Sequence, residues 1–98
     1  MKKMLYGKIL FAHYVVSEGR FGISITFKTD DDFTFSSKDE YVADITGNYV
    51  RKERVLHKIY YCLLQTQDNE LVELKDKRVK FSFEDGEFYD FWFIKEEE

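Results

Sequence analysis

The side chains that could act as a nucleophile or a base are few: one cysteine, Cys62, and two histidines, His13 and His57. A Cys–His pair also needs a group that orients the histidine and donors that stabilise the oxyanion. His57 and Cys62 are five residues apart, so on a helix they do not share the i, i+4 face. No motif supplies the missing parts, and Cys62 in its Tyr-Tyr-Cys-Leu-Leu context is typical of a small buried hydrophobe. We therefore expect no catalytic residue and no enzyme.

Metal and nucleotide motifs are missing as well. One Cys and two His do not complete a four-ligand zinc site without carboxylates. Asp30, Asp31 and Asp32 could bind a hard cation, but the spacing of an EF-hand loop is absent, and three consecutive acids are typical of a solvated turn. Neither G-x-x-x-x-G-K nor G-x-G-x-x-G occurs. We expect no metal and no cofactor.

Charge is distributed unevenly along the chain, although the formal net charge is only −4. Residues 30–44 hold six acids against one lysine, and residues 84–98 hold seven acids against one lysine. Between these two acidic blocks, residues 51–58 hold four cations against one glutamate. An acidic surface complements a basic one, and basic surfaces are typical of proteins that handle nucleic acid. The alternative interpretation is an ordinary solvated surface.

We predict a partner-binding surface that combines both acidic blocks with nearby aromatic residues, which are frequent interface hot spots. Its candidate residues are Asp30, Asp31, Asp32, Asp39, Glu40, Glu84, Asp85, Glu87, Tyr89, Asp90 and Trp92. The predicted function is a small acidic protein-binding module that inhibits or adapts a basic partner, such as a nuclease or another nucleic-acid-binding protein. Phage- and mobile-element-encoded inhibitors of host nucleases are often short, acidic and without cofactor motifs. By this analogy alone, we expect a phage- or mobile-element-encoded anti-defence inhibitor.

Two other functions compete with this prediction. The chain has ten Phe, seven Tyr and one Trp, and aromatic strands near cations can stack single-stranded bases. In that case Arg51, Lys52, Arg54 and Lys58 would bind phosphates. The acidic C-terminal block would repel a phosphate backbone, so we assign most aromatics to the core and expect no direct nucleic-acid binding. A small ligand-binding domain or enzyme is the third function, and it requires His13 and His57 in one cleft.

Cysteine usage and the N-terminus bear on location. With one cysteine, no intrachain disulfide can form. The apolar run after the basic N-terminus is broken at His13, which is too early for a signal peptide. No apolar stretch approaches the 18 residues that a membrane span needs. We expect a cytoplasmic protein and no membrane association.

Strand patterns dominate the two ends of the chain. Residues 4–16 are rich in β-branched and aromatic types, residues 21–28 alternate strictly, and the Ser-Glu-Gly-Arg connection predicts a hairpin. Residues 33–35 form a short third strand. Residues 79–83 alternate again, and Asp85-Gly86 predicts a hairpin turn into an aromatic strand at 88–94.

The middle of the chain has two interpretations at each of two segments. Ser37 and Glu40 have capping-box spacing, which predicts a short helix at 38–46, whereas Gly47-Asn48 could instead be a hairpin turn. Residues 49–64 favour a helix over a strand buried on both faces. The polar stripe of that helix would be Arg51, Arg54, Lys58, Tyr61 and Gln65, and its apolar side Val55, Leu56, Ile59, Tyr60, Cys62 and Leu63.

Together these elements predict one compact α+β domain over residues 1–98, with a solvated acidic tail at 95–98. Its sheet is mostly antiparallel and five- to six-stranded, with one or two helices. An all-β small barrel is the alternative. We also expect residues 21–28 to be an exposed edge strand that supports a homodimer by strand pairing.

Overall fold

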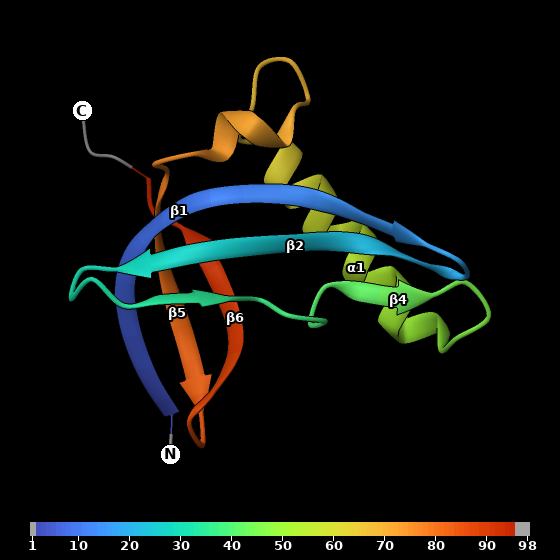
Figure 1. Ribbon diagram of the computed structural model, residues 1–98, viewed down its shortest axis with the longest axis horizontal. Coiled ribbons are helices and arrows are strands. Elements are labelled where there is room, and N and C mark those ends of the chain that lie inside the picture. The colour runs from blue at the N-terminus through green and yellow to red at the C-terminus, as the bar shows by residue number, and fades with distance from the viewer. Residues whose placement is uncertain (1, 96–98) are drawn as a thin grey trace.

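The computed structural model describes residues 2–95 and is an antiparallel sheet with one α-helix and a short 3-10 helix (Figure 1). The elements in chain order are β1 (Lys2–Ser17), β2 (Arg20–Thr29), β3 (Thr34–Ser36), β4 (Val42–Asp44), α1 (Tyr49–Leu63), η1 (Leu71–Leu74), β5 (Arg78–Glu84) and β6 (Glu87–Phe93). The strand order is β3-β2-β1-β5-β6, and β4 pairs with β2 beside β3. The α+β prediction with a mostly antiparallel sheet is confirmed.

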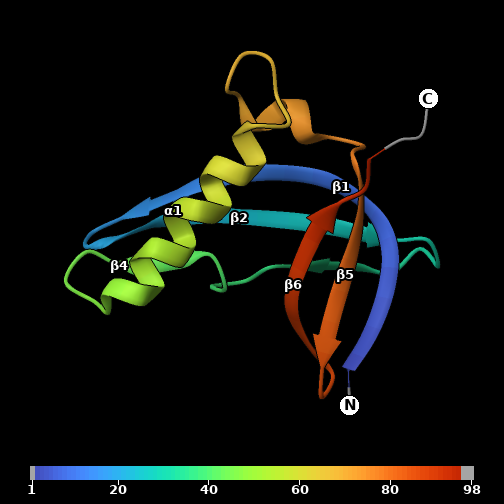
Figure 2. The ribbon, with the colours of Figure 1, turned by 180° about the vertical axis from the view of Figure 1, so that it is seen from behind.

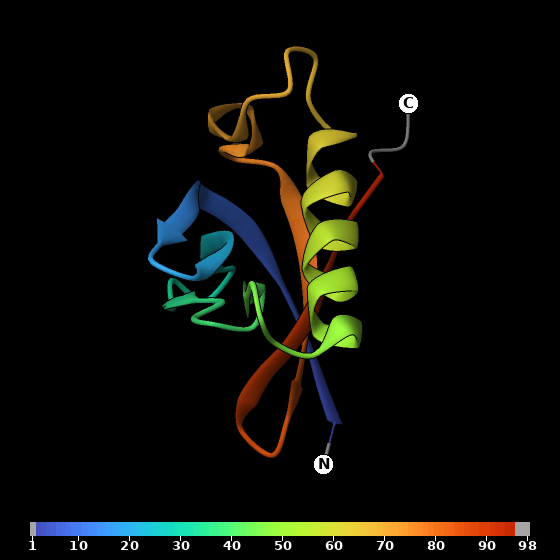
Figure 3. The ribbon, with the colours of Figure 1, turned by 90° about the vertical axis from the view of Figure 1, so that its right-hand side faces the viewer.

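Strand β1 belongs to two halves of the sheet and bends between them. Its first residues pair with β5, from Lys2↔Glu84 to Lys8↔Arg78, and its later residues pair with β2 as far as Ser17. The two halves meet at Gly7 and Lys8, which pair with both neighbours. An added Cβ at Gly7 would be 2.1 Å from the Lys28 carbonyl oxygen, and a bulge follows between Ile9 and Phe11. The sheet therefore curves round a concave side, with the β1–β2 hairpin and α1 in separate layers (Figure 3).

The core on this concave side combines phenylalanine rings with Ile, Leu and Val side chains. The predicted alternation of β2 holds, because Ile23, Ile25 and Phe27 are all buried. The ring of Phe27 meets Phe81 and Phe91 from the other half of the sheet, with centroids 5.0 and 5.1 Å apart. Such tilted and edge-to-face pairs are favourable beyond the area they bury. These aromatics therefore join the two halves of the bent sheet.

The prediction of a helix at 38–46 is wrong, and so is the alternative turn at Gly47-Asn48. The Ser37 hydroxyl does not cap a helix but accepts the backbone N–H of Ile25, 3.1 Å away. After a turn, residues 42–44 pair with β2 as strand β4. Asn48 instead caps α1, because its side-chain oxygen accepts the N–H groups of Val50 and Arg51.

Helix α1 is confirmed, but its predicted apolar side is only partly right: Val55 and Cys62 are buried, and Ile59 and Leu63 pack against the core. The cationic stripe faces the sheet, while Leu56 and Tyr60 from the predicted apolar side are 55% and 66% exposed. Only Val55 and Cys62 of the helix are fully buried. The first turn of α1 lies near β4, and the helix rises along the side where the sheet does not close (Figure 2).

The predicted hairpin turn at Asp85-Gly86 is confirmed, whereas the predicted edge strand at residues 21–28 is wrong. Asp85 and Gly86 have φ values of 52° and 83°, as the predicted hairpin turn requires. Residues 21–28 are not an edge strand, because β2 pairs with β1 on one side and with β3 and β4 on the other. Of the predicted tail, Lys95 is exposed and residues 96–98 lie outside the described residues.

Candidate functional site

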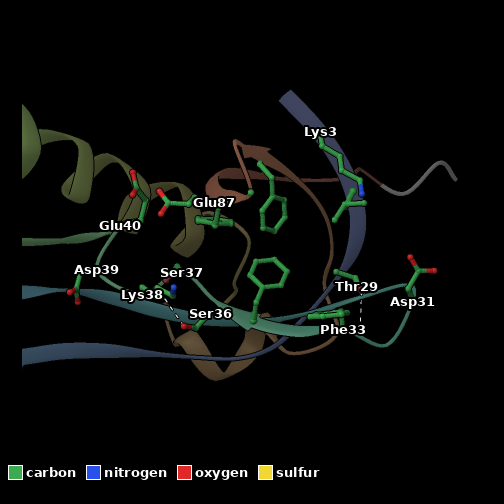
Figure 4. A pocket seen from close by; sticks show the side chains of 15 residues that line it. Lys3, Thr29, Asp31, Phe33, Ser36, Ser37, Lys38, Asp39, Glu40 and Glu87 are labelled. Atoms are coloured by element: carbon green, nitrogen blue, oxygen red, sulfur yellow. Dashed lines mark hydrogen bonds between the residues drawn. The ribbon is translucent and has the colours of Figure 1, made fainter. Parts of the chain in front are cut away.

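A groove opens between β3 and the β5–β6 hairpin, where the curved sheet is not closed (Figure 4). Its volume of about 730 Å³ is in the size range of ligand and peptide sites. The wall is aromatic, formed by Phe33, Phe35, Phe83 and Phe88. Phe35 packs on Phe83 with ring centroids 5.1 Å apart, so this wall continues the core outward.

The rim of the groove brings the two acidic blocks together. Asp31, Asp39 and Glu40 come from the first block, and Glu87 comes from the second. In Figure 4, Asp31 lies at one end of the groove and Glu40 and Glu87 lie at the other. Lys3 and Lys38 also line it, so four carboxylates face two cations. Four of the eleven predicted partner-binding residues therefore share one concave site.

The rim carboxylates differ in how far the protein itself neutralises them. Glu40 pairs with Arg54 at 2.8 Å, and Asp39 pairs more loosely with Arg20 at 3.4 Å. Within residues 2–95, the side chains of Asp31 and Glu87 have no hydrogen-bond or ion-pair partner. These two carboxylates are available to a cation from outside.

Four other predicted acids do not line this groove: Asp30, Asp32, Glu84 and Asp85. Asp30 binds Arg78 through two hydrogen bonds of 2.7 and 3.2 Å, and that hydrogen bonding holds the pKa of Asp30 below its usual value. Asp32 pairs with Lys28 at 3.1 Å. Glu84 and Asp85 are exposed at the β5–β6 turn.

The predicted aromatic hot spots also lie elsewhere. Tyr89 has Arg54 over its ring at 5.6 Å, and Trp92 has Lys80 over its ring at 5.9 Å. Neither lines the groove, whereas Phe33 does and is 71% exposed. The sequence predicts Phe33 only as part of a strand. Its position directly after three acidic residues is the signal that could have identified it as a residue of the binding surface.

Asp90 is part of an internal cluster. Its carboxylate accepts hydrogen bonds from Lys58 at 2.8 Å and from the Tyr41 hydroxyl at 2.6 Å. Burial alone would raise the pKa of Asp90, but these hydrogen bonds outweigh it and lower the pKa. Burial raises the pKa of Tyr41. Asp90 thus anchors α1 to β6 rather than facing outward.

The basic block is used internally along its whole length. Arg51 donates to the carbonyls of Val42 and Asp39, and Lys52 donates to that of Ile45. Arg54 and Lys58 bind the carboxylates already described. The phosphate contacts of the nucleic-acid alternative would require these four side chains to leave their partners.

The remaining reactive residues do not line the groove. His13 stacks on Phe11 on β1, and His57 is exposed on α1, 3.8 Å from Glu53. Neither histidine lines this groove or the smaller pocket at Lys8, Lys28 and Arg78. Cys62 is fully buried, and burial raises the pKa of its thiol to about 12.

Within residues 2–95, no group of three or more His, Cys, Asp or Glu is placed to hold a metal ion. No helix among the described residues has the length and apolar character needed to cross a membrane. The chain matches no protein-family model, no curated protein and no solved structure.

Proposed function

We propose that this protein is a small acidic binding module that acts as an inhibitor or adaptor of a basic, nucleic-acid-handling protein. The observation that carries this proposal is the groove, in which two acidic segments far apart in the sequence form the rim of one aromatic-walled cavity. An inhibitor of this kind would occupy the surface on which the partner binds nucleic acid. A phage or mobile-element origin remains part of this proposal by analogy of profile.

The chemistry of the groove favours an arginine-rich partner surface. A guanidinium can bind a carboxylate through two hydrogen bonds while its flat face stacks on an aromatic ring. Asp31 and Phe33 are two residues apart and line the groove together. An exposed Phe beside an unpaired carboxylate also resembles the aromatic anchors found at interfaces. Opposite charge would speed association and make it sensitive to salt.

The test reverses only the two unpaired rim carboxylates. The double variant Asp31→Lys/Glu87→Lys is compared with Glu53→Lys/Asp68→Lys, which has the same formal net charge but is altered away from the groove. Each immobilised protein is exposed to lysate of the source cells at about 50 mM and about 500 mM salt, a range that spans strong to weak screening. Proteins retained by the wild type are identified, purified and assayed for nucleic-acid binding in its presence.

We expect the wild type and the control variant to retain the same basic protein at low salt and to block its nucleic-acid binding. The groove variant is expected to lose both. Equal retention by the groove variant and the control would contradict the proposal, as would a retained partner whose nucleic-acid binding is unaffected.

A further inference from the structure

The second half of β1, residues 11–17, is an open edge of the sheet. Its sequence, Phe-Ala-His-Tyr-Val-Val-Ser, contains no Asp, Glu, Lys or Arg. It pairs with β2 on one side only, because the pairing with β5 ends at Lys8↔Arg78. The side chains along it are exposed, with Phe11 at 54%, Tyr14 at 50% and Val16 at 83%.

The pairing of β2 shows which backbone groups this edge presents. Odd-numbered β2 residues bond toward β3 and β4, as in Ser37 N–H to the Ile25 carbonyl and Ile23 N–H to the Tyr41 carbonyl. Even-numbered β2 residues therefore bond toward β1, where their register partners are Phe11, His13, Val15 and Ser17.

The intervening residues of β1 consequently point their N–H and C=O groups away from the sheet. They are Ala12, Tyr14 and Val16. No other group within residues 2–95 hydrogen-bonds to these backbone atoms.

The other edges of the sheet lack this combination of length and exposure. Side chains of α1 bind the outward backbone groups of β6 and β4, as with Tyr61 at Phe93 and Arg51 at Val42. Strand β3 is only three residues long, and a short edge is a poor template for pairing. At Ile9 the backbone of Asp76 and Lys77, next to η1, covers the edge of β1, but beyond that residue the edge carries neither form of protection.

We propose that a second copy of this chain pairs antiparallel with residues 11–17, with Tyr14 opposite Tyr14 of the second copy. Ala12 of each copy then lies opposite Val16 of the other, so all three outward residues exchange pairs of N–H···O bonds. A shift of the register leaves some of them unpaired. The contact is two-fold symmetric and closed, so it stops at a dimer.

The ends of this pairing place an acid near a lysine, and the neighbouring Asp76 is already paired with Lys8 at 3.3 Å. In the same register Glu18 of one copy lies opposite Leu10 of the other, next to Ile9, whose N–H donates to the Lys77 carbonyl. The hairpin tip with Glu18 therefore approaches Lys77 of the second copy at both ends of the contact. An uncharged central strand favours a copy of itself over the basic partner of the groove, because it offers that partner no carboxylate.

A single strand pair buries less surface than the roughly 800 Å² per partner of a stable complex, so the dimer should depend on concentration. We expect sedimentation equilibrium to show a monomer at about 10 µM and mostly dimer at about 1 mM. Amide exchange of Ala12, Tyr14 and Val16 should slow at least tenfold over that range, while exchange of Thr34 and Ser36 on β3 should not change.

The deciding variant is Val16→Lys, which adds a charge to the open edge without removing a bond of the monomer. It should remain monomeric at about 1 mM, while Val72→Lys, the same change at a 69% exposed site on η1, should dimerise like the wild type. Denaturant unfolding verifies that both variants fold. A monomer at every concentration overturns the proposal, as does a dimer that survives Val16→Lys or is abolished instead by Leu56→Lys on α1.

Discussion

Strand β6 and the second half of β1 are two edges of one sheet, and they differ in whether another part of the protein binds their outward backbone groups. Along β6, Arg54, Lys58 and Tyr61 of α1 bind the backbone of residues 89, 91 and 93 at 3.1, 3.3 and 2.8 Å. Along β1, the corresponding outward groups have no partner within residues 2–95. The helix therefore takes the place of a neighbouring strand at one edge and leaves the other edge open.

The match between helix and strand has a geometric basis. Residues 54, 58 and 61 advance by three or four positions along α1, or roughly 5–6 Å at 1.5 Å per residue. Two residues of a strand advance about 6.6 Å. Long side chains absorb the difference, so a polar helical stripe can follow a strand edge step by step. This explains why the cations of α1 face inward.

Of the variants considered, Lys58→Met should have the largest effect on stability, because it removes a cation that binds the covered β6 edge. Asp90 would remain half-buried without its ion-pair partner, so we expect a loss of about 2–3 kcal/mol in the free energy of unfolding, measured with urea. The double variant Lys58→Met/Asp90→Leu should recover much of this loss. Equal stability of Lys58→Met and the wild type would show that the ion pair does not secure this edge.

Acid should weaken the covered edge before the open one. The lowered pKa of Asp90 means that its ionised form stabilises the fold above the ordinary aspartate pKa. That contribution is lost as the pH falls from about 4 through the pKa of Asp90 in the folded state. In amide exchange we expect Phe93 to lose protection in this range, and Asp90→Asn should flatten the pH dependence. If stability still falls at acidic pH to the same extent in Asp90→Asn, this pH dependence comes from other carboxylates.

Two neighbouring proline variants test which side of β1 is open. Val15→Pro removes an N–H that bonds to β2, whereas Val16→Pro removes one that points outward. We expect Val15→Pro to lose about 2 kcal/mol more stability than Val16→Pro. Thermal and urea unfolding at about 10 µM, where the chain should be monomeric, measures the difference. The reverse order would mean that the edge faces the other way.

The smallest effect should come from Tyr61→Phe, which removes only the hydroxyl that accepts the Phe93 N–H. The ring still packs on Phe93, with centroids 5.2 Å apart. We expect a loss of about 1 kcal/mol in stability and faster amide exchange at Phe93. Tyr60→Phe, at a 66% exposed position on the same helix, is the matched control and should change neither.

Local patterns predicted most of the fold. The alternation of residues 21–28, the Asp85-Gly86 turn and the helix over 49–64 depend on neighbouring residues, and the structure confirms them. The short helix at 38–46 failed because Ser37 found a partner twelve residues away, at Ile25, in place of a local cap. A capping box and a strand connection cannot be distinguished from the same few residues.

The orientation of α1 and the composition of the groove depend on contacts between residues far apart in the sequence. The order of charges along the chain does not show these contacts. The basic stripe looked solvated because its partners, Glu40 and Asp90, lie in the two acidic blocks. Much of the charge segregation in the sequence is therefore complementarity within the fold. The sequence predicted both acidic blocks, but not that Asp31 and Glu87 line the same groove.

The buried position of Cys62 provides a reporter of motion. A thiol that is 0% exposed, and whose pKa burial raises to about 12, reacts with an aqueous thiol reagent only when α1 lifts from the sheet. Because the chain contains no second cysteine, the labelling rate measures a single opening event. The labelling rate of Cys62 therefore reports how often the helix that covers the β6 edge detaches from the sheet.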